Sequence, residues 1–304
     1  MGLRELLREG PSPIDGGLAS ELEAQGHDLS GRLWSARLLA DDPDAIRGVH
    51  AAYFAAGARV AISASYQASR HAFALAGLDA ARADELLTLS VELARVARDQ
   101  AARTTSGELL VAASVGPYGA ALADGSEYRG HYGLSHQGLL DFHAERLAVL
   151  AAASPDLLAV ETIPDVVEAA AVVEALGAHP DLPAWITYSC ADGATTCGGD
   201  AFDEAVRMAT SAPSVVAVGV NCTAPEHVTA LLRLARTATD LPLVVYPNAG
   251  RTWDAQARAW SGGGADILPA DHVAAWVDAG AALVGGCCGL GPTAIRAISA
   301  ALAE

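Results

Sequence analysis

The chain of 304 residues is poor in basic side chains, with 19 Lys and Arg against 36 Asp and Glu and a formal net charge of −17. A protein that binds nucleic acid needs a basic face that displaces counterions, and an anionic membrane surface attracts the same kind of face. Neither is therefore expected as a partner, which leaves small molecules as the expected partners.

Long uninterrupted hydrophobic runs are also missing. Charged residues such as Arg59 and Glu161 break the apolar stretches before they reach the roughly 20 residues of a membrane-spanning helix. The amino terminus, MGLRELLREG, has no apolar core of a signal peptide. Cysteine is scarce, and an odd count of five with two adjacent residues predicts no disulfide framework. The expected compartment is a reducing cytoplasm.

Short β-branched runs alternate along the chain with longer segments of helical period. Strands are predicted near Ser12–Asp15, Arg59–Ser65, Leu109–Val115, Leu157–Thr162, Ala184–Ser189, Val215–Asn221, Leu243–Tyr246 and Ala281–Gly285. Helices are predicted over Pro43–Ala56, Ala80–Arg103, Ser135–Ala153, Asp165–Leu176, Pro225–Thr239 and Pro292–Leu302. Dividing 304 residues among eight strand–helix units gives 38 residues per unit. This α/β pattern favours one (β/α)8 TIM-type barrel domain over residues 1–304.

Polar residues gather at the carboxyl ends of the predicted strands, for example Asp15 after the first and Glu161 at the end of the fourth. A barrel carries its active site on that face. An open doubly wound sheet would bind its ligand at the same edge. The barrel is favoured, because no G-x-G-x-x-G motif opens a helix after the first strand.

Three of the five cysteines lie at two of these strand ends: Cys222 after Val215–Asn221, and the pair Cys287 and Cys288 after Ala281–Gly285. Adjacent residues of an extended strand point to opposite sides. The glycines that flank the pair permit a sharp turn that would aim both sulfurs at one metal ion. Three thiolates are one ligand short of a closed tetrahedral zinc shell, and zinc enzymes bind substrate at such an open position. The sequence therefore predicts a zinc site at these cysteines.

Other interpretations of the cysteines remain open at this point. Free cysteine is often buried as a small apolar residue, which is the expected state of Cys190 and Cys197. A vicinal redox disulfide would require a strained ring between adjacent residues. A zinc hydrolase would need histidine or carboxylate ligands, but the histidines show neither H-x-H nor H-E-x-x-H spacing. A non-catalytic metal-binding protein would need no carboxylates aligned at other strand ends.

The type of ligand also indicates the chemistry. Three thiolates donate enough negative charge to make zinc a poor activator of water. The same ion would hold a further thiolate well and leave it electron-rich. The predicted chemistry is therefore alkylation of a sulfur atom.

Motifs that run through nearly the whole chain resemble one known family. They are DGGLASEL from Asp15, LWSA from Leu33, SASYQAS from Ser63, ASVGPYGAALADGSEYRGHY from Ala113, ETIP from Glu161, VGVNCTAP from Val218, VYPNAG from Val245 and GGCCG from Gly285. In this order they resemble the zinc-dependent homocysteine S-methyltransferases, particularly the type that uses S-methylmethionine as methyl donor. The resemblance implies methyl transfer to homocysteine, which gives methionine.

The resemblance also implies a role for each matching strand end. Cys222, Cys287 and Cys288 would bind zinc, and the homocysteine thiolate would take the fourth position. Asp15 and Glu161 would bind the ammonium group of homocysteine. The other implied contacts are the backbone at Gly16 and the hydroxyl of Ser63 for homocysteine, with Tyr66 and Gln67 on the donor side.

One local departure concerns the methyl donor. Members of the S-methylmethionine type often carry Arg-Thr after the paired cysteines, whereas this chain has Gly289-Leu290. Glycine is common there in the broader family, including the betaine and cobalamin-dependent branches, which carry a carboxyl-terminal extension or further domains. S-methylmethionine is the expected donor, with S-adenosylmethionine and betaine as alternatives. The sequence does not determine the oligomeric state.

Overall fold

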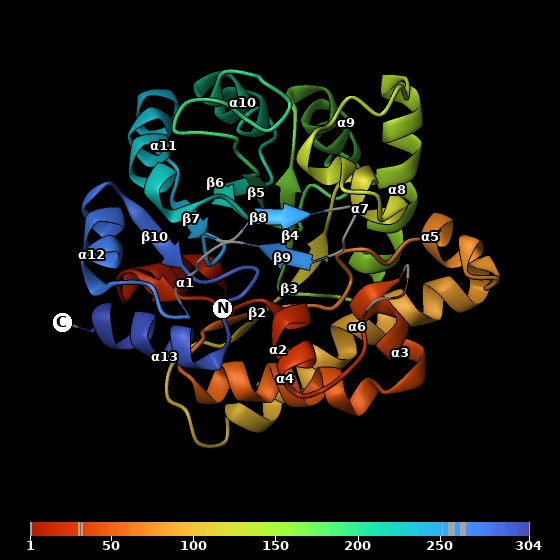
Figure 1. The fold of residues 1–304 in the computed structure, drawn as a ribbon, viewed down its shortest axis with the longest axis horizontal. Coiled ribbons are helices and arrows are strands. Elements are labelled where there is room, and N and C mark those ends of the chain that lie inside the picture. The colour runs from red at the N-terminus through yellow and green to blue at the C-terminus, as the bar shows by residue number, and fades with distance from the viewer. Residues whose placement is uncertain are drawn as a thin grey trace.

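Eight parallel strands form a barrel that is surrounded by helices (Figure 1). The computed structural model describes residues 2–29, 31, 33–250, 252–254, 259–261 and 266–303. The strand order is β1-β10-β7-β6-β5-β4-β3-β2, and a parallel bridge between Ile14 and Val60 joins the two edges of the sheet. The predicted (β/α)8 architecture is therefore confirmed.

The barrel strands lie where the apolar runs predict them. Their bounds are β1 Ser12–Pro13, β2 Val60–Ile62, β3 Leu110–Val115, β4 Leu157–Ile163, β5 Ala184–Tyr188, β6 Val215–Asn221, β7 Leu243–Tyr246 and β10 Ala281–Val284. Every residue of β3, β4, β5 and β7 is buried. Strands covered on both faces are apolar without alternation, which is why continuous runs rather than alternating ones mark them in the sequence.

The helices include all of the predicted ones, with ends that differ by a few residues. They are α1 Leu3–Arg8, α2 Leu18–Ala24, α3 Leu38–Asp41, α4 Pro43–Ala55, α5 Arg70–Leu75, α6 Ala80–Ala101, α7 Tyr118–Leu122, α8 His136–Ala152, α9 Val166–Leu176, α10 Phe202–Ala209, α11 Pro225–Ala238, α12 Ala270–Asp278 and α13 Pro292–Ala301. Two 3-10 turns, η1 Trp34–Arg37 and η2 Ser126–Tyr128, lie in loops. Within the described ranges, no helix combines the length and apolar character needed to cross a bilayer.

The sequence does not predict a short antiparallel pair, β8 (Thr252–Asp254) with β9 (Ala259–Ser261). Strands of three residues contain too little periodicity to be recognised. This pair forms its own two-stranded sheet and is not part of the barrel.

Alternate strand residues divide the core into an inner and an outer layer. The inner layer draws on strands all around the barrel and includes Val60, Ala112, Trp185 and Leu283. The outer layer packs the other strand faces against the helices. The inner layer is apolar through most of its depth, and it contains the ring of Tyr246 at the carboxyl end of β7. The polar side chains that line the cavity lie beyond this apolar layer, at the carboxyl ends of the strands.

Candidate metal centre and active site

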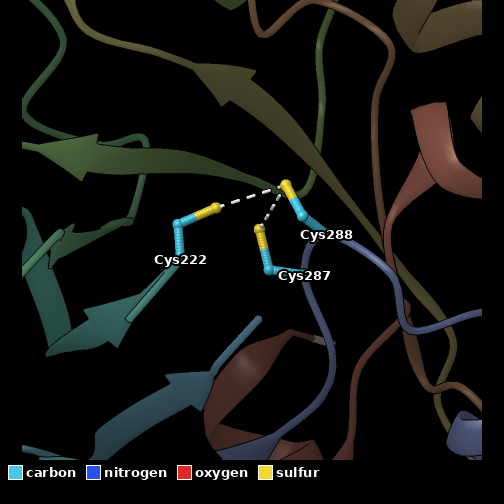
Figure 2. A group of neighbouring side chains, drawn as sticks. All are labelled: Cys222, Cys287 and Cys288. Carbon is cyan, nitrogen blue, oxygen red and sulfur yellow. Dashed lines mark hydrogen bonds between the residues drawn. The ribbon is translucent and has the colours of Figure 1, made fainter. Parts of the chain in front are cut away.

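The three predicted metal ligands meet at the carboxyl ends of β6 and β10. Cys288 Sγ lies 3.6 Å from Cys222 Sγ and 3.9 Å from Cys287 Sγ, and the three side chains point toward one another (Figure 2). Backbone bonds tie both segments to β7 and the residue after it. The Cys222 amide donates to the Tyr246 carbonyl at 3.1 Å, and the Cys287 amide donates to the Pro247 carbonyl at 2.8 Å. The backbone itself thus brings the sulfurs together.

The spacing of the sulfurs fits a tetrahedral metal ion. With zinc–sulfur distances of about 2.3 Å, two thiolates on a tetrahedral ion lie about 3.8 Å apart. All three sulfurs lie within 4.8 Å of one another, and the cluster found among the described residues contains no histidine or carboxylate. All five cysteines are free, so the adjacent pair does not form a disulfide. The donor set is therefore one that suits zinc.

The pKa of Cys222 is shifted in the opposite direction to those of Cys287 and Cys288. Hydrogen bonds from Cys287 and Cys288 hold the pKa of Cys222 well below its usual value. The same contacts with Cys222, together with burial, raise the pKa of Cys287 and Cys288. One thiolate is thus favoured in this cluster, and it is on Cys222. A divalent cation would favour the remaining deprotonations, so the cluster is electrostatically suited to bind one.

The turn after the paired cysteines explains the glycine at position 289. Gly289 has a φ of 82°, a left-handed conformation that residues with a Cβ rarely adopt. A Cβ there would also lie 2.8 Å from the Ala249 Cβ. The Gly289 amide donates to the Ser20 hydroxyl at 2.7 Å, and the carbonyl of buried Leu290 accepts from the Gly17 amide at 3.0 Å. Gly289 and Leu290 thus anchor the cysteine pair to the start of α2.

A cavity of about 110 Å³ opens beside the cysteine cluster. Besides the three cysteines, the predicted site residues that line it are Gly16, Ser63, Tyr66 and Glu161. Asp15 and Gln67 are not among the lining residues. The strand ends therefore bring most of the predicted residues to one place.

Two carboxyl groups at this end of the barrel have no ion-pair partner among the described residues. Glu161 lines the cavity and accepts a hydrogen bond from the Ser114 hydroxyl, and burial raises its pKa to about 7. Asp15 is buried, and its Oδ2 accepts from the Ile62 amide at 2.7 Å while its Oδ1 has no hydrogen-bond partner. Burial raises the pKa of Asp15 well above its usual value, and the charge of Glu161 adds to this shift. A cationic ligand group would relieve both effects.

The side chains of Ser63, Tyr66 and Gln67 differ in what they contact. The Ser63 hydroxyl accepts from the Ser114 amide at 3.1 Å and lies at the cavity wall. Tyr66 also lines the cavity, and burial raises the pKa of its phenol well above its usual value. The Gln67 amide instead donates to the Ala120 carbonyl at 3.2 Å, so this end of the side chain is directed at α7.

Residues 14–302 match the homocysteine S-methyltransferase family model. The chain belongs to the homocysteine S-methyltransferase family. A homocysteine S-methyltransferase of Escherichia coli (strain K12) is 46% identical over 290 residues, covering 94% of this chain and 94% of its own. The homocysteine S-methyltransferase YbgG of Bacillus subtilis (strain 168) is 40% identical over 292 residues, covering 94% and 93% of the two chains.

Solved structures within the homocysteine S-methyltransferase family share the fold. The metallated form of the homocysteine methyltransferase MmuM from Escherichia coli has a TM-score of 0.89 and 44% identity, over 98% of this chain and 99% of its own. The apo form of the same protein gives a TM-score of 0.80. The family and the enzyme class predicted from the sequence, a methyltransferase, are therefore confirmed, and a relative of this fold binds a metal.

Two tyrosines that are not among the predicted site residues, Tyr246 and Tyr128, also line the cavity. Tyr246 ends β7, where its hydroxyl lies 2.8 Å from Thr187 Oγ1 and accepts from Trp185 Nε1 at 3.2 Å. Tyr128 ends η2 and donates to Cys222 Sγ at 3.7 Å. Both residues lie inside motifs that carry the family resemblance, GSEYRGHY and VYPNAG. Their position in those motifs is the sequence feature that could have identified them as site residues.

Beneath the cavity, the amide of Asn221 joins the ends of β4 and β6. Its Nδ2 donates to Thr162 Oγ1 at 2.7 Å, and its Oδ1 accepts from the Thr162 amide at 2.7 Å and from Thr187 Oγ1 at 2.8 Å. Thr162 and Cys222 both adopt a left-handed backbone, with φ of 62° and 47°. Such conformations persist only where the surroundings enforce them. Asn221 therefore holds the segments that carry Glu161 and Cys222 in shape.

Replacing Asn221 by alanine is expected to lower the free energy of unfolding by about 3 kcal/mol, since buried partners at Thr162 and Thr187 lose their hydrogen bonds. Metal content after purification should fall as well, because the Asn221 side chain no longer holds the backbone segment that carries Cys222. Denaturant unfolding and metal analysis measure the two effects. Gln137→Ala, which removes an exposed amide on α8, is the control and should change stability by less than about 0.5 kcal/mol. Unchanged metal content in Asn221→Ala would contradict this account.

Proposed function

We propose that this protein transfers a methyl group from a sulfonium donor to the thiol of L-homocysteine, producing methionine, with zinc held by Cys222, Cys287 and Cys288. One observation supports this most strongly: a cluster of three thiols lies beside a cavity that is lined by Glu161, and neither Glu161 nor the nearby buried Asp15 has an ion-pair partner among the described residues. A thiol amino acid offers the two complementary groups, a sulfur for the metal and an ammonium for the carboxylates.

The amino-acid end of homocysteine would be bound at the first and fourth strand ends. Both Asp15 and Glu161 have a raised pKa in the free protein, and a bound ammonium group would favour their ionised forms. The backbone at Gly16 and the hydroxyl of Ser63 line the same cavity and would contact the rest of the amino-acid group. These assignments give the ligand a fixed direction, with its thiol toward the cysteines.

Zinc is proposed because three thiolates without histidine suit this ion best. When bound, zinc would supply the charge that keeps the homocysteine sulfur deprotonated at neutral pH, since a free thiol has a pKa near 8.5. A zinc hydrolase is disfavoured, because the cluster has no imidazole or carboxylate ligand and three thiolates leave the ion a poor activator of water.

We propose S-methylmethionine as the donor, with S-adenosylmethionine and betaine as alternatives. Tyr66 and Tyr128 line the cavity, and aromatic side chains attract cationic groups such as a sulfonium. In the reaction a new carbon–sulfur bond forms to homocysteine while the methyl–sulfonium bond breaks, and the donor leaves as a neutral thioether. No general acid is needed, so the chain's task is to align the two sulfurs. Gln67 would have only an indirect role on the donor side, because its amide is bonded to the Ala120 carbonyl.

The test combines metal analysis with a methyl-transfer assay. Purified protein is expected to hold about one zinc ion per chain and to make methionine from homocysteine and S-methylmethionine, with lower kcat/KM for S-adenosylmethionine and betaine. A metal-loaded protein that turns over none of the three donors would refute the proposal and favour a non-catalytic metal-binding role.

The free thiols of the cluster also suit a reducing compartment, and we propose the cytoplasm.

A further inference from the structure

The hydroxyl of Tyr128 is placed against one particular sulfur of the cysteine cluster. It donates to Cys222 Sγ at 3.7 Å, from the loop between β3 and α8. Cys287, by contrast, has no hydroxyl donor among the described residues, and its side-chain hydrogen bonds are with the other two cysteines. The three sulfurs therefore differ in how many donors they face.

The loop that delivers Tyr128 is held by contacts that do not involve the cluster. Gly119 of α7 packs so closely on η2 that a Cβ there would lie 2.4 Å from the Glu127 amide nitrogen. After η2 the chain is fixed by Asp165 at the start of α9, whose Oδ2 accepts from the His131 amide at 3.0 Å. The hydroxyl is thus positioned by the fold.

A metal site built from thiolates has a problem of selectivity in a methyl-transfer reaction. Every thiolate around the ion is a nucleophile, and a sulfonium donor could methylate a protein sulfur in place of the substrate. A hydrogen bond to a thiolate lowers its basicity, and nucleophilicity toward carbon falls with basicity. The sulfur that accepts the strongest hydrogen bonds is therefore the least reactive.

We propose that Tyr128 is a positioning residue whose hydroxyl protects Cys222 from alkylation by the methyl donor. The proposal deepens the proposed function and rests on it, because it requires a metal that holds the cysteines as thiolates. It assigns a task to a hydroxyl that methyl transfer itself does not need. A conservative substitution to phenylalanine removes the hydroxyl of Tyr128 and keeps its ring, which makes the proposal testable.

The experiment treats zinc-loaded wild-type and Tyr128→Phe proteins with iodoacetamide in the absence of substrates. Alkylation forms a carbon–sulfur bond and releases iodide, and peptide mapping gives a rate for each cysteine. In Tyr128→Phe, Cys222 is expected to react about three- to tenfold faster than in the wild type, while the rate at Cys287 is unchanged. Because phenylalanine keeps the ring, Cys287 also reports any change in access. Tyr132→Phe, which removes a hydroxyl that donates to Glu168, is the matched control.

Cobalt(II) in place of zinc provides a second measurement that does not depend on alkylation. Thiolates that lose a hydrogen bond donate more strongly, so the sulfur-to-cobalt charge-transfer absorption of Tyr128→Phe is expected at longer wavelength than in the wild type. An unchanged ratio of Cys222 to Cys287 alkylation overturns the proposal, and so does loss of metal from Tyr128→Phe, since the hydroxyl would then serve binding. Failure of the wild type to bind zinc would instead refute the proposed function.

Discussion

Replacing Cys288 by serine is expected to remove the bound metal and to lower kcat/KM for methyl transfer at least about a thousandfold, a loss of about 4 kcal/mol in the transition state. Cys288 is the central sulfur of the cluster, at 3.6 Å from Cys222 Sγ and 3.9 Å from Cys287 Sγ. A serine hydroxyl does not ionise at neutral pH and is a poor zinc ligand. Two thiolates alone would leave the ion weakly held.

Metal analysis and the methionine assay should be run on the same preparations, because the expected losses are coupled. Cys197→Ser is the matched control: this cysteine is free and lies outside the cluster, so its replacement should leave metal content and turnover near those of the wild type. A metal-free Cys288→Ser protein with full turnover would show that methyl transfer proceeds without the thiolate cluster.

The barrel could be predicted from the sequence because its strands are buried on both faces. The run from Val215 to Val220 contains no polar side chain, and Asn221, the polar residue that ends it, marks the carboxyl end of the barrel. The cysteine cluster was predictable for a related reason. Cys222 and the glycine-flanked Cys287 and Cys288 each come directly after such a run, and parallel strands end on one face.

The contacts that complete the site could not be predicted in the same way. Tyr128 reaches Cys222 from a loop 94 residues earlier in the chain, and no local pattern encodes a contact of that separation. Asn221 is next to Cys222 in sequence, but its role depends on Thr162 at the end of another strand. Gln67, in contrast, is a predicted site residue that does not line the cavity. Its neighbour Tyr66 lines the cavity, whereas the Gln67 amide bonds to Ala120, because the chain turns at these residues and strand alternation does not apply to them.

Replacing Glu161 by glutamine is expected to weaken homocysteine binding about a hundredfold at pH 8 while zinc content stays unchanged, because the ammonium group loses a buried carboxylate. Burial raises the pKa of Glu161 to about 7, so the carboxyl is ionised above that pH and protonated below it. The advantage of glutamate over glutamine is therefore present above pH 7 and is lost as the pH falls through 7. By pH 6 the ratio of the two dissociation constants should shrink to about tenfold.

The same substitution should stabilise the ligand-free protein. A carboxyl whose pKa rises from its usual 4.5 to about 7 on folding makes the fold less stable as the pH rises from 4.5 to 7, and the loss persists above 7. Glu161→Gln removes this cost and is expected to raise the free energy of unfolding at pH 8 by about 3 kcal/mol. Glu174→Gln, an exposed carboxyl on α9, is the control for both measurements.

Calorimetry that finds unaltered homocysteine binding in Glu161→Gln would remove Glu161 from the ammonium site. Weakened binding with the same ratio at pH 6 and pH 8 would show that its charge is not what binds the ammonium.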